Sequence, residues 1–215
     1  MSAIAASAST KRNPDATREA ILQAAFEEMY EHGFQAASLD RILKRTGVTK
    51  GALYHHFKNK LELGYAVIED VIRPKMLSVW LQAMSESDNP LESMRRVIQA
   101  AQDREIEAAC RFGCPLNNFA QEMSPLDEGF RHRIQATFET WRRGLAQALR
   151  QGQAVGTVRQ GIDPNHMATF ILAAIEGTIG LVKSSQDPAV FEASYQGLDR
   201  FLSTLEPEDS QPRVA

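Results

Sequence analysis

The sequence predicts an all-α fold, with a three-helix N-terminal domain that contains a helix-turn-helix and a larger helical C-terminal domain. Apolar residues recur along the chain at steps of three and four, which is the period of a helix buried on one face. Nothing comparable predicts a strand or hairpin. A short polar residue followed by proline, a combination that begins helices, occurs at Asn89-Pro90, Ser124-Pro125, Asp163-Pro164 and Asp187-Pro188.

The first helix opens at Asn13-Pro14 or Asp15 and ends at Gly33, where glycine tolerates the left-handed backbone. Its buried face is predicted by the spacing of Ile21, Leu22, Ala25, Phe26 and Met29. We expect disordered tails at residues 1–13 and 207–215, an N-terminal domain over 14–60 and a C-terminal domain over 61–206.

Two short helices follow, joined by a tight turn. Ser38 caps the first, and Gly47 permits the positive φ that ends it. Thr49 caps the second, in which Leu53 and Phe57 face the core. The residues left facing outward are Lys50, Gly51, Ala52, Tyr54 and His55. Small residues at the start of such a helix allow a backbone to approach base edges in the major groove.

Charge is distributed unevenly along the chain. Residues 1–60 hold nine Lys/Arg and six Asp/Glu, whereas the remainder holds fifteen and twenty-one. No carboxylate interrupts the positive residues between Arg41 and Lys60, which are Arg41, Lys44, Arg45, Lys50, Lys58 and Lys60. Such a cationic surface attracts phosphate backbones. The alternative interpretation is a solvated helix face.

The C-terminal domain is predicted to be built from long helices. The longest has Phe130, Ile134, Phe138, Trp141, Leu145 and Leu149 on one side. The others are expected over 60–85, 91–109, 115–123, 164–184 and 188–205. Asn59 and Glu62 resemble a capping box at the first of these, and Pro74 should kink or divide it.

Several classes of protein are disfavoured. The longest apolar run, Phe170 to Ile175, is too short to cross a bilayer, so we expect a cytoplasmic protein that does not contact a membrane. No nucleotide loop, Gly-x-Ser-x-Gly or His-Glu-x-x-His motif is present, and Cys110 and Cys114 lack the spacing of redox or zinc pairs. Adjacent His55 and His56 point to different helix faces. We therefore expect no enzymatic activity, cofactor or metal.

The motifs of the N-terminal domain resemble those of the TetR family, named for the tetracycline repressor. The resemblance rests on Gly33-Phe34, Thr46-Gly47-Val48-Thr49 and the run from Tyr54 to Lys60, Tyr-His-His-Phe-Lys-Asn-Lys. It implies a homodimer that reads a near-palindromic DNA operator and is most often a repressor released by a small-molecule effector. The implied phosphate contacts are Ser38, Thr49, Tyr54 and Lys60, and the implied base-facing residues are Lys50, Gly51, Ala52 and His55. A helical interaction module that does not bind DNA is the alternative, although it would not need the basic stretch.

The resemblance also implies a dimer interface and an effector pocket in the C-terminal domain. Small residues at steps of three and four, with apolar neighbours, place the interface at Ile171, Ala173, Gly177, Gly180, Ser184, Leu198, Phe201 and Leu202. Their alternative role is in the core of a monomer. Candidate pocket residues are Phe112, Cys114, Asn117, Asn118, Met123, Phe138, Trp141 and Phe170.

Cys114 carries an alternative function. It precedes a predicted helix, whose first amides, with Arg111 nearby, would lower the thiol pKa and favour the reactive thiolate. A redox- or electrophile-responsive regulator is the resulting hypothesis. The alternative is that Cys114 is a small buried residue.

Overall fold

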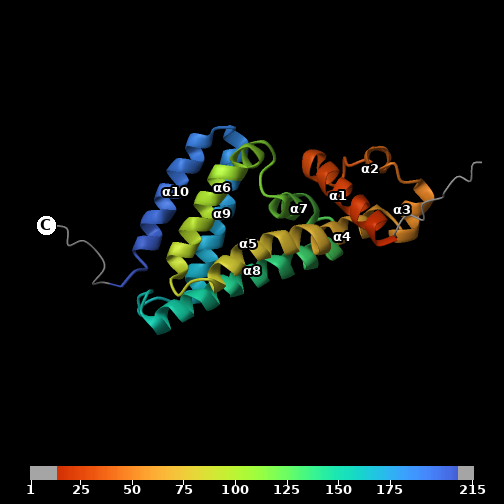
Figure 1. Cartoon of the computed structure of the whole chain (residues 1–215). Helices are drawn as coiled ribbons and strands as arrows, with labels where there is room; N and C mark the ends of the chain where they lie inside the picture. The colour runs from red at the N-terminus through yellow and green to blue at the C-terminus, as the bar shows by residue number, and fades with distance from the viewer. Residues whose placement is uncertain (1–13, 208–215) are drawn as a thin grey trace, which may run out of the picture. The chain divides into compact units, whose positions relative to one another are not determined.

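A computed structural model describes residues 14–207, except the side chains of residues 104 and 105. Within this range the chain consists of α-helices and one π-helical turn, without strands (Figure 1). The elements are α1 (Pro14–His32), α2 (Leu39–Thr46), α3 (Lys50–His56), α4 (Lys60–Ala66), η1 (Val67–Ile72), α5 (Arg73–Ser85), α6 (Pro90–Phe112), α7 (Pro115–Met123), α8 (Glu128–Val155), α9 (Pro164–Ser185) and α10 (Pro188–Ser203). The all-α prediction is confirmed. The expected tails, apart from Pro207, lie outside the described residues.

The chain divides into two compact units, here called the head (Met1–Val67) and the body (Ile68–Ala215). The division lies after Val67, whereas the sequence placed it after Lys60. The difference is α4, which packs against α1 and so belongs to the head. A capping pattern marks where a helix begins, but it carries no information about the unit in which that helix is buried.

Helix starts follow the predicted caps with one exception. Asn89, Asp163 and Asp187 accept hydrogen bonds from amides in the first turns of α6, α9 and α10. The prediction that Ser124-Pro125 begins a helix is wrong, because Ser124 ends α7. The chain there forms a turn closed by Asp127 N on the Met123 carbonyl at 3.0 Å, and the Asp127 carboxylate then begins α8.

A continuous helical segment runs from α4 through η1 to α5. The π-helical turn over Val67–Ile72 interrupts the α-helical pattern just before Pro74, which lies in the first turn of α5. Proline has no amide proton to donate to the preceding turn, so a change in hydrogen bonding is expected at this point. The predicted division of the helix thus takes the form of a wider turn.

Each unit has its own core. In the head, Ile21, Ala25, Ile42 and Leu53 are almost completely buried. In the body, α8 packs against α5, α7 and α9, and the ring centroids of Trp141 and Trp80 lie 5.0 Å apart. The predicted stripe of α8 is buried at Phe130, Ile134, Trp141, Leu145 and Leu149, and partly buried at Phe138.

Candidate nucleic-acid interface and ligand pocket

The turn between α2 and α3 is held by side-chain caps at both helix starts. Ser38 Oγ accepts from Arg41 N at 3.4 Å, and Thr49 Oγ1 accepts from Ala52 N at 3.3 Å. Gly47 ends α2 at φ +63°, which a residue without a Cβ adopts without strain. A hydroxyl whose oxygen accepts from the backbone can still donate its hydrogen to an anion. The caps therefore fix two potential phosphate donors, Ser38 just before α2 and Thr49 in the turn before α3.

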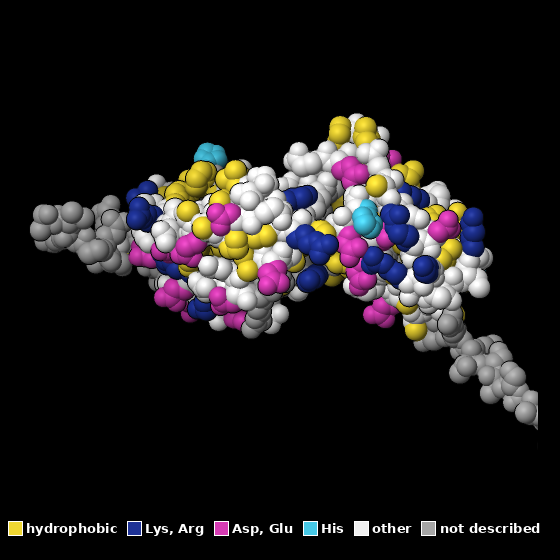
Figure 2. Space-filling model, turned by 90° about the horizontal axis from the view of Figure 1, so that it is seen from above, with side chains coloured by type: hydrophobic (Ala, Val, Ile, Leu, Met, Phe, Trp, Pro, Cys, Tyr) yellow, Lys and Arg dark blue, Asp and Glu magenta, His cyan; other side chains and the backbone are white. Residues whose placement is uncertain are grey.

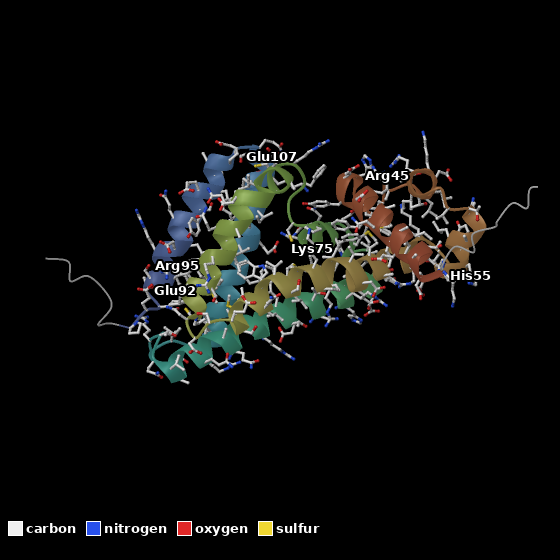
Figure 3. All side chains as sticks on the ribbon, in the orientation of Figure 1. Arg45, His55, Lys75, Glu92, Arg95 and Glu107 are labelled. Carbon is white, nitrogen blue, oxygen red and sulfur yellow. The ribbon has the colours of Figure 1, made fainter. Side chains whose placement is uncertain are left out.

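The outer face of α3 is open. Lys50, Gly51 and His55 are exposed, Tyr54 is 42% exposed and Ala52 is half-buried. A Cβ placed on Gly51 would meet no atom within 4 Å, so the start of α3 presents backbone to the surroundings. Figure 3 shows His55 at the outer edge of the head. Leu53 and Phe57 are buried on the opposite side, which anchors the helix to the core.

The basic stretch is less cationic in space than in sequence. Arg41 Nε donates to Glu28 Oε1 at 2.6 Å, and Arg45 Nη2 donates to Glu31 Oε2 at 2.8 Å. Arg45 also pairs with Glu27 at 3.3 Å. Figure 2 shows positive and negative side chains interspersed over the head. The interpretation of an uninterrupted positive run is wrong for the two arginines, because α1 supplies carboxylates from elsewhere in the chain.

Lys44, Lys50 and Lys58 remain exposed, while Lys60 is held locally. Lys60 Nζ donates to the Gln35 carbonyl at 3.0 Å and lies 5.0 Å from the centroid of the Phe34 ring. An ammonium group carries three donors, so this bond is compatible with a phosphate contact. It also ties the start of α4 to the loop after α1.

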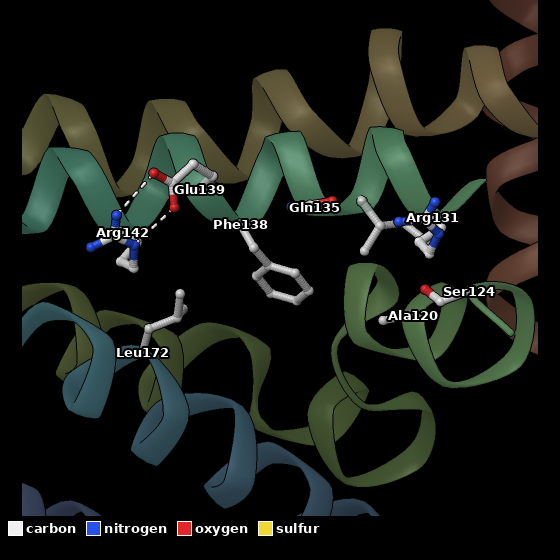
Figure 4. A pocket seen from close by; sticks show the side chains of 9 residues that line it. Ala120, Ser124, Arg131, Gln135, Phe138, Glu139, Arg142 and Leu172 are labelled. Atoms are coloured by element: carbon white, nitrogen blue, oxygen red, sulfur yellow. Dashed lines mark hydrogen bonds and ion pairs between the residues drawn. The ribbon is translucent and has the colours of Figure 1, made fainter. Parts of the chain in front are cut away.

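The body contains a cavity of about 430 Å³ between α7, α8 and α9, and this cavity is broadly open to solvent. Figure 4 shows Phe138 projecting from α8 into this space, between Leu172 of α9 and Ala120 of α7. The apolar lining residues are Ala120, Ile134, Phe138 and Leu172. The polar lining residues are Ser124, Arg131, Gln135, Glu139 and Arg142. An apolar wall with a few polar groups is typical of a small-molecule site.

Phe138 is the one expected pocket residue that lines this cavity. Met123 and Trp141 are buried in the core, and Asn118 donates to the Phe112 carbonyl. Phe170 is 52% exposed and packs on Phe201 with ring centroids 4.6 Å apart, and it does not line this cavity. Helical periodicity identifies the inner face of a helix but not the part that its neighbours leave uncovered. Arg131, Gln135 and Arg142 share that face with Phe138 and were missed.

Cys114 lies beside Glu176, a partly buried carboxyl group of α9. Burial, and then the charge of Glu176, raise the pKa of the Cys114 thiol well above its ordinary value. The amides of Asn117 and Leu116 lower it, as the helix start predicts, but by less. Arg111 lies over the Phe112 ring at 4.7 Å. The predicted lowering of the thiol pKa is therefore wrong, and the basis for a reactive thiolate is removed.

The small residues of α9 lie on the surface of the body. Ala173, Gly177, Gly180 and Ser184 are exposed, and beside them Leu181 is 58% exposed. Ile171, Leu198 and Leu202 were expected at the same interface but are buried in the core, where they have almost no surface to offer. Ile171 shares α9 with the exposed residues, whereas Leu198 and Leu202 lie on the buried face of α10.

Two further features bear on classification. Within residues 14–207 no group of three or more His, Cys, Asp or Glu residues is placed to hold a metal ion. One described helix, α9, is long and apolar enough to cross a membrane by length and composition, and little of it is buried. Helices of soluble proteins pass the same test, so this is weak evidence.

Known protein families match both the head and the body. Residues 21–67 match "Bacterial regulatory proteins, tetR family", and residues 80–198 match "Tetracyclin repressor-like, C-terminal domain". The transcriptional regulator AcuR of Cereibacter sphaeroides is 33% identical over 171 residues, 77% of each chain. A crystal structure of a regulatory protein TetR from Rhodobacter sphaeroides superposes with TM-score 0.77 at 30% identity, covering 86% of this chain and 97% of that one. A SmeT–triclosan complex superposes with TM-score 0.71 at 28% identity, covering 93% and 96%.

Proposed function

Since the chain belongs to the TetR family of bacterial transcriptional regulators, we propose that it is a repressor that leaves its operator when a small molecule binds in the body. The observation that carries this proposal is the open face of α3, where exposed Lys50, Gly51 and His55 follow a capped turn. A rigid short helix with small residues at its start fits the major groove. Such a protein works in the cytoplasm, where its DNA is.

The residues of the head divide into two roles. Ser38, Thr49, Tyr54 and Lys60 contact phosphates and set the register of the helix on the duplex. The base-facing set is Lys50, Gly51, Ala52 and His55. Of these, Lys50 has the long cationic side chain that donates to guanine, and Gly51 brings the backbone of α3 close to the base edges. The exposure of Lys50, Gly51 and His55 supports the assignment.

A homodimer places two heads on the half-sites of a near-palindrome. The exposed face of α9 supports this arrangement, because Ala173, Gly177 and Gly180 allow close helix approach and Leu181 supplies apolar surface. A second copy covering this face also accounts for the apolar character of a helix of which little is buried. Contact between two copies removes this surface from water.

The effector occupies the cavity between α7, α8 and α9. Its volume of about 430 Å³ suits a small organic molecule. The SmeT neighbour, which was crystallised as a triclosan complex, is a precedent for such a ligand in a protein of the same fold. Binding releases the operator only if the ligand prefers the conformer with the lower affinity for DNA.

A gel-shift titration of the full chain tests DNA binding. The probe is the duplex upstream of the protein's own coding sequence, or the sites recovered by a genomic pull-down, with a shuffled duplex of equal composition as control. The expected preference for the probe is about 10³-fold or more, with affinity falling as salt is raised. A protein that binds no duplex at low ionic strength is not a DNA-binding regulator.

A further inference from the structure

Glu176 on α9 has a buried polar atom that the protein does not satisfy. Among the described residues, its Oε2 is shielded from solvent and lacks a hydrogen-bond partner. Most buried polar atoms in folded proteins have a partner, so an exception calls for a reason. An oxygen kept dry and unpaired is a place where a ligand group can bind.

The carboxyl group lies beside the start of α7. The side chains of Cys114 and Asn117, just before and in the first turn of α7, are close enough to Glu176 to lower its pKa. Oε2 nevertheless remains without a hydrogen-bond partner. Burial raises the pKa of Glu176 to about 7, so its neutral and ionised forms lie close in free energy near neutral pH.

Glu176 lies one helical turn from the cavity described above. Leu172 lines the cavity and precedes Glu176 by four residues on α9, so the two side chains share a face. Ala120 lines the cavity and follows Asn117 by three residues on α7. Since Asn117 contacts Glu176, both helices place this group next to the edge formed by Ala120 and Leu172. Glu176 does not itself line the cavity, so a ligand group that binds Oε2 must displace side chains at this edge.

We propose that Glu176 is the polar recognition group of the effector site, and that the effector is a neutral molecule with an apolar body and one hydroxyl that donates to Glu176 Oε2. The inference rests on the proposed function, because it names the ligand class of the same cavity. A hydroxyl suits both forms of the carboxyl group, because it donates to an ionised oxygen and accepts from a protonated one.

Charge at the cavity favours a neutral ligand over an ion. Arg131 and Arg142 line the wall, which opposes an ammonium group, although Glu139 holds Arg142 through two hydrogen bonds of 2.8 and 2.9 Å. A ligand carboxylate would meet Glu176 at the far end. The apolar body would pack on Ile134 and Phe138, which belong to the apolar part of the lining.

The test is a calorimetric titration of the full-length protein with two probes, triclosan and its methyl ether. They share an apolar aromatic body, but only triclosan has a hydroxyl. We expect the protein to bind triclosan about 10-fold or more tightly than the ether. Glu176→Leu should bring this ratio close to one while the ether still binds. Glu92→Gln, at an exposed position of α6, is the matched control and should keep the ratio.

Glu176→Gln provides a second measurement in case Glu176→Leu does not fold. Its amide oxygen is a weaker, uncharged acceptor, so the ratio should fall several-fold. An unchanged ratio in a folded Glu176 variant overturns the proposal, as does equal binding of the two probes by the parent. If neither probe binds at about 1 mM, the ligand class is wrong. In that case operator binding in the gel shift still supports the proposed function. Discrimination between the two probes without operator binding would support the ligand site but contradict the proposed function as a DNA-binding regulator.

Discussion

Arg41 and Glu28 join the first two helices of the head through a hydrogen bond of 2.6 Å from Nε to Oε1. Glu28 is completely buried and also accepts from the backbone amide of Ser38 at 3.0 Å. Burial acts to raise its pKa, but the bonds from Arg41 and Ser38, with the charges of Arg41 and His32, hold it below the ordinary value. One carboxylate therefore fixes the start of α2 against α1.

Glu28→Gln should loosen the helix-turn-helix. The amide retains the size of the side chain but loses the charge that Arg41 requires, at a cost of about 2 kcal/mol. Hydrogen exchange followed by mass spectrometry should show protection of α2 amides falling about 30-fold. Glu27→Gln removes an exposed partner of Arg45 and should leave protection unchanged. Equal effects of the two substitutions would show that the burial of Glu28 has no special role.

Lys60→Ala should weaken binding to every DNA sequence and lower the slope of log affinity against log salt by about one, because the proposed phosphate contact of Lys60 is lost. Arg45→Ala is the comparison, since this guanidinium is already paired with Glu31 and Glu27. The slope of log affinity against log salt for Arg45→Ala should equal that of the parent. A smaller slope for Arg45→Ala but not for Lys60→Ala would reverse the assignment.

Lys50→Ala should change the preference between operator sequences, because the exposed Lys50 starts α3 and belongs to the proposed base-facing set. Competition gel shifts with single-base operator variants measure this preference. Discrimination should relax at one position of each half-site by a factor that corresponds to about 1–3 kcal/mol. A uniform loss over all variants would instead identify Lys50 as a phosphate contact.

Leu181→Arg should prevent the proposed dimer from forming. This side chain is 58% exposed beside Gly177 and Gly180, and a charge there would be buried without a partner in a close helix interface. Sedimentation equilibrium should detect monomers. Leu126→Arg, in the turn before α8, changes a side chain that is 62% exposed and should leave the mass unaltered. A dimeric Leu181→Arg variant would exclude this face of α9 as the interface.

Glu176 should make the body less stable as pH rises. Its pKa in the folded protein is about 7, above the ordinary 4.5, so the folded state retains a proton that the unfolded state releases between these values. Stability from this group is full below the lower pKa and declines through the window, by up to about 3 kcal/mol above the upper one.

Glu176→Gln should remove that decline. Urea unfolding followed by the fluorescence of Trp80 and Trp141, both in the body, measures it at about pH 5 and about pH 8. The free energy of unfolding should vary less with pH in the variant than in the parent or in Glu92→Gln. Identical pH dependence in all three would mean that Glu176 is not desolvated.

Local sequence signals predicted the head in most of its detail. The caps at Ser38 and Thr49, the positive φ at Gly47 and the inward positions of Leu53 and Phe57 all depend on residues within one helical turn of each other. The charge of the same segment was misjudged at Arg41 and Arg45. Their partners lie 13 to 18 residues away on α1, so a pattern of neighbouring residues does not reveal these ion pairs.

The pocket was predicted poorly for a related reason. Phe138, Trp141 and Ile134 lie on one side of α8, yet Phe138 and Ile134 line the cavity while Trp141 is covered by Trp80. Which of them borders empty space depends on where α7 and α9 pack. The raised pKa of Cys114 has the same origin, because Glu176 is 62 positions away in sequence.

By itself the sequence determined the helical fold, the helix-turn-helix and the family, because caps, turns and periodic apolar faces arise from interactions between residues close together in the chain. Only the tertiary structure decided which charges are paired, where the cavity lies and which buried carboxyl oxygens lack a hydrogen-bond partner. Those properties depend on solvent exclusion and on distances between helices, which are set when separate segments pack.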